Sequence, residues 1–159
     1  MSPPLASDRP EVRDAQDEVL YRETFRIVGN DFEHGGEVAT RVKAVLKQLG
    51  LPTAVIRRLS IANFEAEMNV IMYADEGSLD LEVLHGSVRV TVSDRGRGIP
   101  DIEWAMQEGH STATAEMRAR GFGAGLGLPN IKRNSDEFSI ASTAGVGTTL
   151  RYVVRADGS

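Results

Sequence analysis

Two glycine-rich stretches, 20 residues apart, constrain this chain more than any other feature of its sequence. The first, at residues 94–101, reads Asp-Arg-Gly-Arg-Gly-Ile-Pro-Asp, and the second, at 121–128, reads Gly-Phe-Gly-Ala-Gly-Leu-Gly-Leu. Because glycine has no Cβ atom and reaches positive φ at little cost, such turns let backbone amides approach phosphate oxygens closely. A nucleotide, with ATP first, is therefore the leading hypothesis for the ligand.

The length of the chain predicts one folded domain. Its 159 residues, 41% of them hydrophobic, suffice for one sizeable core and leave no room for a second. Residues 1–18 contain three prolines and five acidic residues but few large apolar ones, so we expect a flexible N-terminal tail there. We assign residues 19–156 to the single domain.

Charge and composition exclude several classes of partner. The net charge of −5 argues against a general attraction to nucleic acid or to an anionic membrane. The absence of cysteine excludes disulfides and thiolate metal sites, and it fits a reducing compartment. No apolar run approaches the roughly 20 residues of a membrane span. We expect a soluble protein of the cytoplasm.

Hydrophobic periodicity and turn residues divide the domain into strands and helices. The pattern predicts strands at 21–28, 78–84, 87–93, 137–142 and 148–155, and helices at 36–49, from 52 to beyond 73, 100–109 and 126–134. Residues 75–77 read as a loop, and residues 110–120 as a mobile lid. This order predicts an α+β fold, a two-layer sandwich of a mixed, mostly antiparallel sheet with helices on one face.

Glu65 and Asn69 lie four residues apart in the second predicted helix, so their side chains share one face. A carboxylate can accept a proton from an attacking hydroxyl, and an amide oxygen is a hard ligand suited to Mg²⁺. Taken alone, the pair is more often a solvated helix surface. Glu67 points about 160° away from Asn69, at about 100° per residue, and is set aside.

Asp94 leads the first glycine-rich stretch, where a carboxylate can accept a hydrogen bond from the exocyclic amine of adenine. The alternative is an aspartate that stabilises its own turn. The second stretch adjoins a helix start, where free amides and the helix dipole favour an anion such as phosphate. Its alternative is a flexible loop. No Gly-Lys-Ser/Thr follows and no strand precedes it, so neither a Walker loop nor a Rossmann fingerprint fits.

Taken together, these elements resemble the N, G1, G2 and G3 boxes of the GHKL (Bergerat-fold) ATPase superfamily. The four motifs are Glu65-x-x-x-Asn69, Asp94-x-Gly96-x-Gly98, Gly121-x-Gly123-x-Gly125-x-Gly127 and Gly147-Thr148. The chain further resembles the RsbT-like switch serine/threonine kinases and the anti-sigma-factor kinases, in stretches such as 94–102 and 106–112. This likeness covers roughly residues 20–155.

The resemblance implies roles for individual residues. Glu65 would be the general base, Asn69 would hold Mg²⁺, and Asp94 would bind the adenine amine. The implied ATP-binding residues are Asn69, Asp94, Gly96, Gly98, Ile99, Gly121, Gly123, Ala124, Gly125, Leu126, Gly127 and Thr148. The segment 113–120 is longer than expected for the subfamily. Arg118 or Arg120 there is more often a solvated or partner-contacting residue than a γ-phosphate ligand.

The same resemblance implies an ATP-dependent protein serine/threonine kinase that phosphorylates a STAS-domain partner in a stress-signalling, stressosome-type switch. A downstream phosphatase or another regulator is a further expected partner. The alternative is a module that binds ATP without phosphotransfer and sequesters a sigma factor or regulates a phosphatase. A histidine kinase half ranks far behind, because no phosphoacceptor helix is evident, as does a gyrase- or chaperone-type ATPase, which needs further domains.

Overall fold

The computed structural model describes residues 18–99, 102–107 and 127–156. The predicted tail, apart from residue 18, lies outside them, as do the predicted lid and residues 121–126 of the second glycine-rich stretch. Pro100, the expected start of the short third helix, is also outside. Residues 101 and 108–109 of that predicted helix, and residue 126 of the predicted helix at 126–134, lie outside as well.

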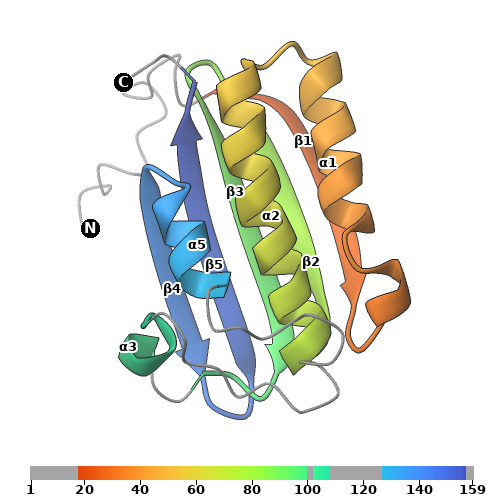
Figure 1. Cartoon of the computed structure of the whole chain (residues 1–159), viewed down its shortest axis with the longest axis vertical. Helices are drawn as coiled ribbons and strands as arrows, with labels where there is room; N and C mark the ends of the chain where they lie inside the picture. The colour runs from red at the N-terminus through yellow and green to blue at the C-terminus, as the bar shows by residue number, and fades with distance from the viewer. Residues whose placement is uncertain (1–17, 100–101, 108–126, 157–159) are drawn as a thin grey trace, which may run out of the picture.

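Five strands form one sheet in the order β1-β2-β3-β5-β4, and every neighbouring pair is antiparallel. The strands are β1 (Val19–Val28), β2 (Ala74–Leu84), β3 (Ser87–Gly96), β4 (Glu137–Thr143) and β5 (Gly147–Arg155). The helices α1 (Glu37–Gln48), α2 (Thr53–Tyr73) and α5 (Gly127–Arg133) lie together on one face of the sheet (Figure 1). The predicted two-layer α+β sandwich is confirmed.

Two short helical segments complete the described structure. The 3-10 helix η4 (Phe32–His34), which the sequence pattern did not predict, joins β1 to α1. The helix α3 (Ile102–Ala105) falls inside the predicted helix at 100–109 but is only four residues long as described. Among the described residues, no helix is both long and apolar enough to cross a bilayer.

The α2–β2 junction differs from the prediction. Residues 75–77 were expected to form a loop, but β2 begins at Ala74, directly after α2 ends at Tyr73. The extended conformation is held because Glu76 pairs with Arg95 and Gly77 with Asp94 in the ladder between β2 and β3. Asp94 therefore lies inside β3 and does not end it. Pairing with a neighbouring strand has outweighed the local turn composition.

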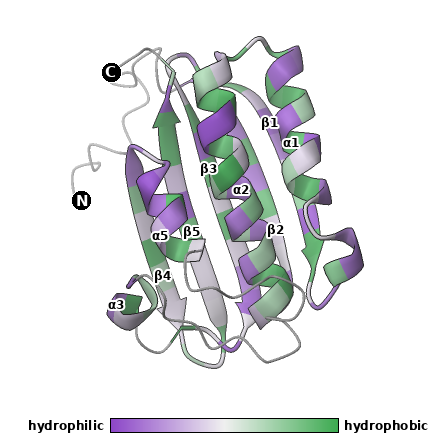
Figure 2. Ribbon diagram, viewed as in Figure 1, coloured by the Kyte–Doolittle hydropathy of each residue, from purple (hydrophilic) through white to green (hydrophobic). Residues whose placement is uncertain are grey.

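The core lies between the sheet and the helices. Strand residues alternate between the buried helix-facing side and the uncovered side, as Leu79, Leu81 and Val83 of β2 do. Leu59 and Ala62 of α2 are fully buried against them. In Figure 2, apolar and polar segments alternate along α1 and α2, which is the pattern of helices with one buried face.

Glu67, which the sequence pattern does not assign to the candidate site, has a structural role. Its buried carboxylate accepts hydrogen bonds from the backbone N–H groups of Gly36, Val38 and Ala39, at 3.0, 3.2 and 2.9 Å. These amides belong to the start of α1, whose N-cap Gly36 has no side chain to cap them. Burial raises the pKa of Glu67, and the three amide hydrogen bonds partly offset that rise. The carboxylate thus fastens α1 to α2 and faces away from Asn69.

Candidate nucleotide-binding site

The helix α2 carries Glu65 and Asn69 one turn apart, and both side chains are half-buried. The start of α5 packs beside Glu65. Asn130 Nδ2 donates a hydrogen bond to Glu65 Oε2 at 3.5 Å. A Cβ atom placed on Gly127 would lie 3.6 Å from the same oxygen. The structure therefore brings Gly127, a predicted ATP-binding residue, next to the predicted general base.

Burial changes the acidity of Glu65. Desolvation raises the pKa of its carboxyl group, and the hydrogen bond from Asn130 lowers it in part. A general base works best when its pKa lies near the working pH, so a raised glutamate pKa improves proton acceptance. The carboxylate accepts one long hydrogen bond from the described residues and keeps other acceptor sites open.

Asp94 and Thr148 meet across neighbouring strands. The backbone N–H of Thr148 donates to Asp94 Oδ1 at 3.1 Å. Burial raises the pKa of the half-buried Asp94 carboxyl group, and this hydrogen bond lowers it in part. Among the described residues, Thr148 is the hydrogen-bond donor to this carboxylate, so Oδ2 keeps its acceptor sites. An amine such as that of adenine is a suitable donor for it.

Ser142, which the sequence pattern did not single out, connects three of these residues. Its Oγ accepts a hydrogen bond from Ile99 N at 2.6 Å and lies 2.8 Å from Thr148 Oγ1. It also donates to the carbonyl of Gly147 at 3.2 Å. A serine near the end of a strand is too common a feature to be found from sequence. Ser142 fixes the position of Thr148 beside Asp94.

Three glycines let the first glycine-rich stretch pack against the β4–β5 turn. A Cβ atom on Gly147 would lie 2.1 Å from the carbonyl oxygen of Asp94. One on Gly98, where φ is +74°, would lie 2.4 Å from the carbonyl oxygen of Thr143. Gly96 N donates to Val146 O at 3.1 Å. The contacts that these glycines permit here are between backbone segments, and their contact with a nucleotide stays a prediction.

The C-terminal end of α2 adjoins the same stretch. Ala74 pairs with Gly96, whose Cβ position lies 2.8 Å from the carbonyl oxygen of Tyr73. The guanidinium of Arg97 lies over the Tyr73 ring, 5.0 Å from its centroid. Glu65, Asn69 and Tyr73 lie along one face of α2, and Tyr73 lies beside Gly96. The part of the candidate site at Glu65 and Asn69 is therefore continuous with the part at Asp94.

The residues present fit Mg-ATP. Counting the described residues alone, Asp94 has an acceptor oxygen left for an amine, and Asn69 offers the kind of oxygen that Mg²⁺ prefers. No cluster of three or more His, Cys, Asp or Glu side chains suited to a metal occurs in the described part of the chain. Mg²⁺ at ATPase sites is held by one or two protein groups together with phosphate oxygens, so this donor set is sufficient. The residues at 121–126 lie outside the described structure.

Comparison with known sequences places the chain in a family. Residues 29–154 match the family model of the histidine kinase-like ATPase domain. The chain is 35% identical over 113 residues to the serine/threonine-protein kinase RsbT of Bacillus subtilis, covering 69% of this chain and 79% of the relative. It is 32% identical over 117 residues to an anti-sigma F factor of Caldanaerobacter subterraneus, covering 70% of this chain and 78% of the relative.

Two solved structures share the fold. One is the SiaB–SiaC complex of Pseudomonas aeruginosa, with a TM-score of 0.56 and 16% identity, covering 86% of this chain and 89% of that chain. The other contains the RsbU and RsbW domains of Rv1364c from Mycobacterium tuberculosis, with a TM-score of 0.54 and 20% identity. That match covers 84% of this chain but 32% of the other. The sequence relatives of the chain include the serine/threonine-protein kinase RsbT and anti-sigma F factors, and the chain belongs to the GHKL, histidine kinase-like ATPase family.

Proposed function

We propose that this protein is a Mg-ATP-dependent serine/threonine kinase that phosphorylates a STAS-domain partner in a stressosome-type partner switch. The observation that carries the proposal is the state of Glu65. Its carboxylate is half-buried, has a raised pKa and stands one turn before Asn69. A relative that is 35% identical is a serine/threonine-protein kinase, which supports the same reaction class.

Each residue has one part in this reaction. When bound, Mg-ATP supplies the γ-phosphoryl group and the positive charge that offsets its negative charge. Asp94 Oδ2 would accept a hydrogen bond from the adenine amine, and Asn69 would offer its side-chain oxygen to Mg²⁺. Glu65 takes the proton from the serine or threonine hydroxyl as that oxygen forms its bond to the γ-phosphorus, while the bond from that phosphorus to the β–γ bridging oxygen breaks and ADP leaves. The proton stays on the Glu65 carboxyl group until solvent removes it.

Phosphorylation then changes the partner's affinity. A phosphoserine or phosphothreonine carries about −1.5 to −2 charges at neutral pH. Placed in an interface, that charge breaks contacts through repulsion and desolvation, so the kinase would release its own product. The kinase, no longer bound to its product, is then free to bind another regulator, such as a downstream phosphatase.

The test is the intact mass of the STAS-domain protein encoded beside this chain, after incubation with the chain and Mg-ATP. We expect a gain of one phosphoryl group, about 80 Da. Glu65→Gln should abolish the gain while ATP still binds, because the amide cannot accept the proton. Glu33→Gln, at an exposed residue of η4, is the matched control and should leave the gain unchanged. Loss of transfer in both variants would contradict a role for Glu65 as base.

The second candidate is a module that binds ATP and a partner without phosphotransfer. The relatives that are anti-sigma F factors favour it. The same experiment separates the two functions. If the STAS-domain protein forms an ATP-dependent complex with the chain and gains no mass, the binding module is the correct function.

A further inference from the structure

An apolar stripe lies on the outer side of α2, away from the core. Ile61 and Phe64 are 40% and 38% exposed, and Arg57 stands one turn before Ile61. The spacing of these three residues, i, i+4 and i+7, places them along one line of the helix surface. We call this line the α2 outer surface. Ile61 lies four residues before Glu65, so the two side chains are neighbours on the helix surface and the stripe leads to the candidate general base.

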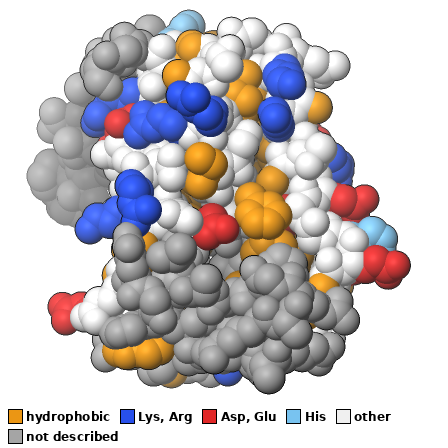
Figure 3. Space-filling model, in the orientation of Figure 1, with side chains coloured by type: hydrophobic (Ala, Val, Ile, Leu, Met, Phe, Trp, Pro, Cys, Tyr) orange, Lys and Arg blue, Asp and Glu red, His pale blue; other side chains and the backbone are white. Residues whose placement is uncertain are grey.

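Basic side chains lie near the α2 outer surface. Figure 3 shows an apolar cluster over α2 with Lys and Arg side chains gathered above it and toward α5. The exposed basic residues of the helix layer are Lys43 and Lys47 of α1, Arg57 of α2, and Lys132 and Arg133 of α5, together with Arg41, whose guanidinium lies over the Phe25 ring of β1. Arg58 is neutralised, because both of its terminal nitrogens bond Asp136 at 3.2 Å. The surface thus combines an apolar contact with a positive surround, in a chain whose net charge is −5.

We propose that the α2 outer surface docks the substrate protein, through an apolar side chain that covers Ile61 and Phe64 and through carboxylates that face Arg57 and the basic end of α5. This inference rests on the proposed function, since it takes Glu65 as the group that the acceptor hydroxyl must reach. A substrate seated one turn before Glu65 holds its hydroxyl close to the carboxylate. Such positioning lowers the entropic cost of the transfer step.

The positive charges around the α2 outer surface favour a different protein, and not a second copy of this chain, as the molecule that binds there. In a two-fold contact through this surface, Arg57 and the lysines of α1 and α5 would face their own copies. Like charges placed across an interface disfavour association. A partner with acidic side chains around an apolar contact gains from the same arrangement, and the attraction weakens as salt rises. The surface therefore fits an acidic substrate protein.

The experiment measures the Kd of the same STAS-domain protein for three variants in the presence of ATP. Ile61→Asp should weaken binding at least tenfold, because it places a charge in the apolar contact. Arg57→Glu should weaken binding severalfold at low salt and less at high salt. Leu20→Asp, at a β1 residue that is 54% exposed, is the matched control and should bind as the unaltered chain does. All three variants should bind ATP equally. Ile61→Asp and Arg57→Glu should raise the KM for the STAS-domain protein without lowering kcat.

Glu65→Gln in the same assay separates the docking inference from the kinase proposal. If Ile61→Asp weakens binding but neither the unaltered chain nor any variant transfers a phosphoryl group, the docking surface stands and the kinase proposal fails. If Ile61→Asp and Arg57→Glu both bind normally, or if the unaltered chain does not bind the STAS-domain protein at all, the docking inference is overturned. Self-association of the unaltered chain that Ile61→Asp abolishes would assign the surface to a second copy and would also overturn it.

Discussion

The two halves of the candidate site are held in different ways. On the adenine side, formed by Asp94, Ser142 and Thr148, four hydrogen bonds of 2.6 to 3.2 Å fix the groups. On the transfer side, formed by Glu65, Asn69 and Asn130, the described residues place one hydrogen bond on Glu65, from Asn130 at 3.5 Å, and Asn130 Oδ1 in turn accepts one from Arg133 at 3.0 Å. In the proposed function, folding would organise nucleotide recognition in advance, which lowers the entropic cost of binding. Within the described residues, the transfer side has acceptor oxygens left for the hydroxyl and the Mg²⁺ of the proposed reaction.

The largest expected effect comes from Gly147→Ala on the adenine side. The added Cβ would stand 2.1 Å from the carbonyl oxygen of Asp94, so the β4–β5 turn must move away from β3. We expect ATP affinity to fall about a hundredfold, equivalent to about 2.7 kcal/mol, in a calorimetric titration. Gly145→Ala is the control, because its Cβ would meet nothing within 4 Å although its φ is +77°. An equal loss in both variants would mean that backbone strain, and not the collision, disrupts the site.

Asp94→Asn tests the adenine side more gently. The asparagine can keep one acceptor oxygen, but its NH₂ group cannot accept from an amine, and the negative charge is lost. We expect ATP to bind about tenfold to a hundredfold more weakly, in line with about 1 to 3 kcal/mol for a charged hydrogen bond. The preference for ATP over GTP should narrow. Asp80→Asn, on the uncovered face of the sheet, should change neither quantity, and an unchanged ATP/GTP ratio in Asp94→Asn would contradict adenine recognition by this group.

Asn130→Ala tests the transfer side through pH. Its hydrogen bond lowers the pKa of Glu65, so its removal should raise that pKa further. The base acts in its ionised form, and the acidic limb of the pH profile of kcat should therefore move to higher pH. ATP affinity should stay within about twofold, since nothing on the adenine side has changed. Lys132→Ala, at an exposed residue of the same helix, should leave the limb in place, and an unmoved limb in Asn130→Ala would contradict the role of Glu65 as base.

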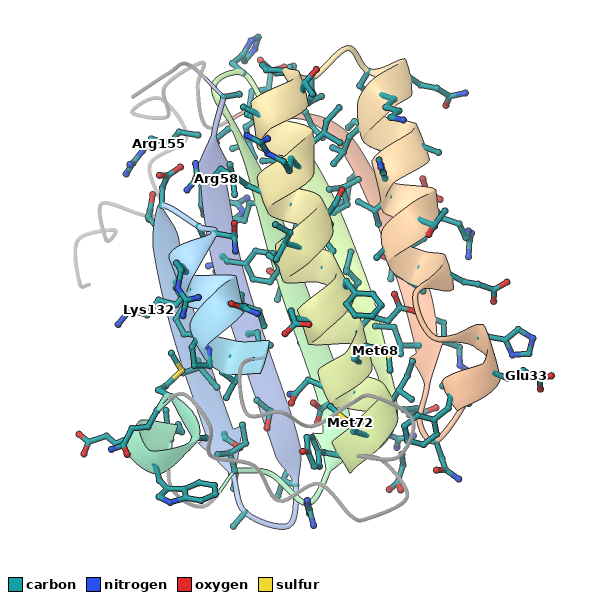
Figure 4. All side chains as sticks on the ribbon, in the orientation of Figure 1. Glu33, Arg58, Met68, Met72, Lys132 and Arg155 are labelled. Atoms are coloured by element: carbon teal, nitrogen blue, oxygen red, sulfur yellow. The ribbon has the colours of Figure 1, made fainter. Side chains whose placement is uncertain are left out.

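The smallest effect is expected away from both halves, at the ion pair that Arg58, labelled in Figure 4, forms with Asp136. Arg58→Gln should lower the free energy of unfolding by about 1 kcal/mol or less. Burial alone would raise the pKa of Asp136, but hydrogen bonds from Arg155 N and Arg58 outweigh it and lower the pKa. The stabilisation is therefore present above the unfolded-state pKa of aspartate and is lost as pH falls through the lowered value. Denaturant titrations of the two proteins should converge at acid pH, and ATP affinity should be equal throughout.

Most of the fold could be predicted from hydrophobic periodicity, because each strand and long helix buries one face only. All five strands and the helices α1, α2 and α5 lie where the pattern placed them, within a few residues. The extended conformation of residues 75–77, near the start of β2, could not be predicted. Asp75, Glu76 and Gly77 have turn composition, and their extended form depends on β3, a partner distant in sequence.

Some of the residues that the motifs singled out lie together in the structure. Asp94 and Thr148, 54 residues apart, share a hydrogen bond, and Gly127 lies next to Glu65. Their part in binding ATP stays a prediction. Ser142 and Asn130 were missed, because each acts only through a tertiary contact that no local pattern records. Helical periodicity separated Glu67 from Glu65 correctly. Periodicity could not show that the Glu67 carboxylate accepts hydrogen bonds from backbone amides of α1.

The direct passage from α2 into β2 has a mechanical consequence. Tyr73 ends the helix and Ala74 begins the strand, so no linker residue lies between them. Ala74 is in turn paired with Gly96 at the end of β3. A rotation of α2 would therefore bear directly on Gly96 and on the start of β2, where the pairing with β3 shifts register between Ala74 and Glu76. If the transfer groups adjust their spacing during a catalytic cycle, the contact between α2 and α5 must also adjust, and among the described residues one 3.5 Å hydrogen bond from Asn130 holds Glu65 there.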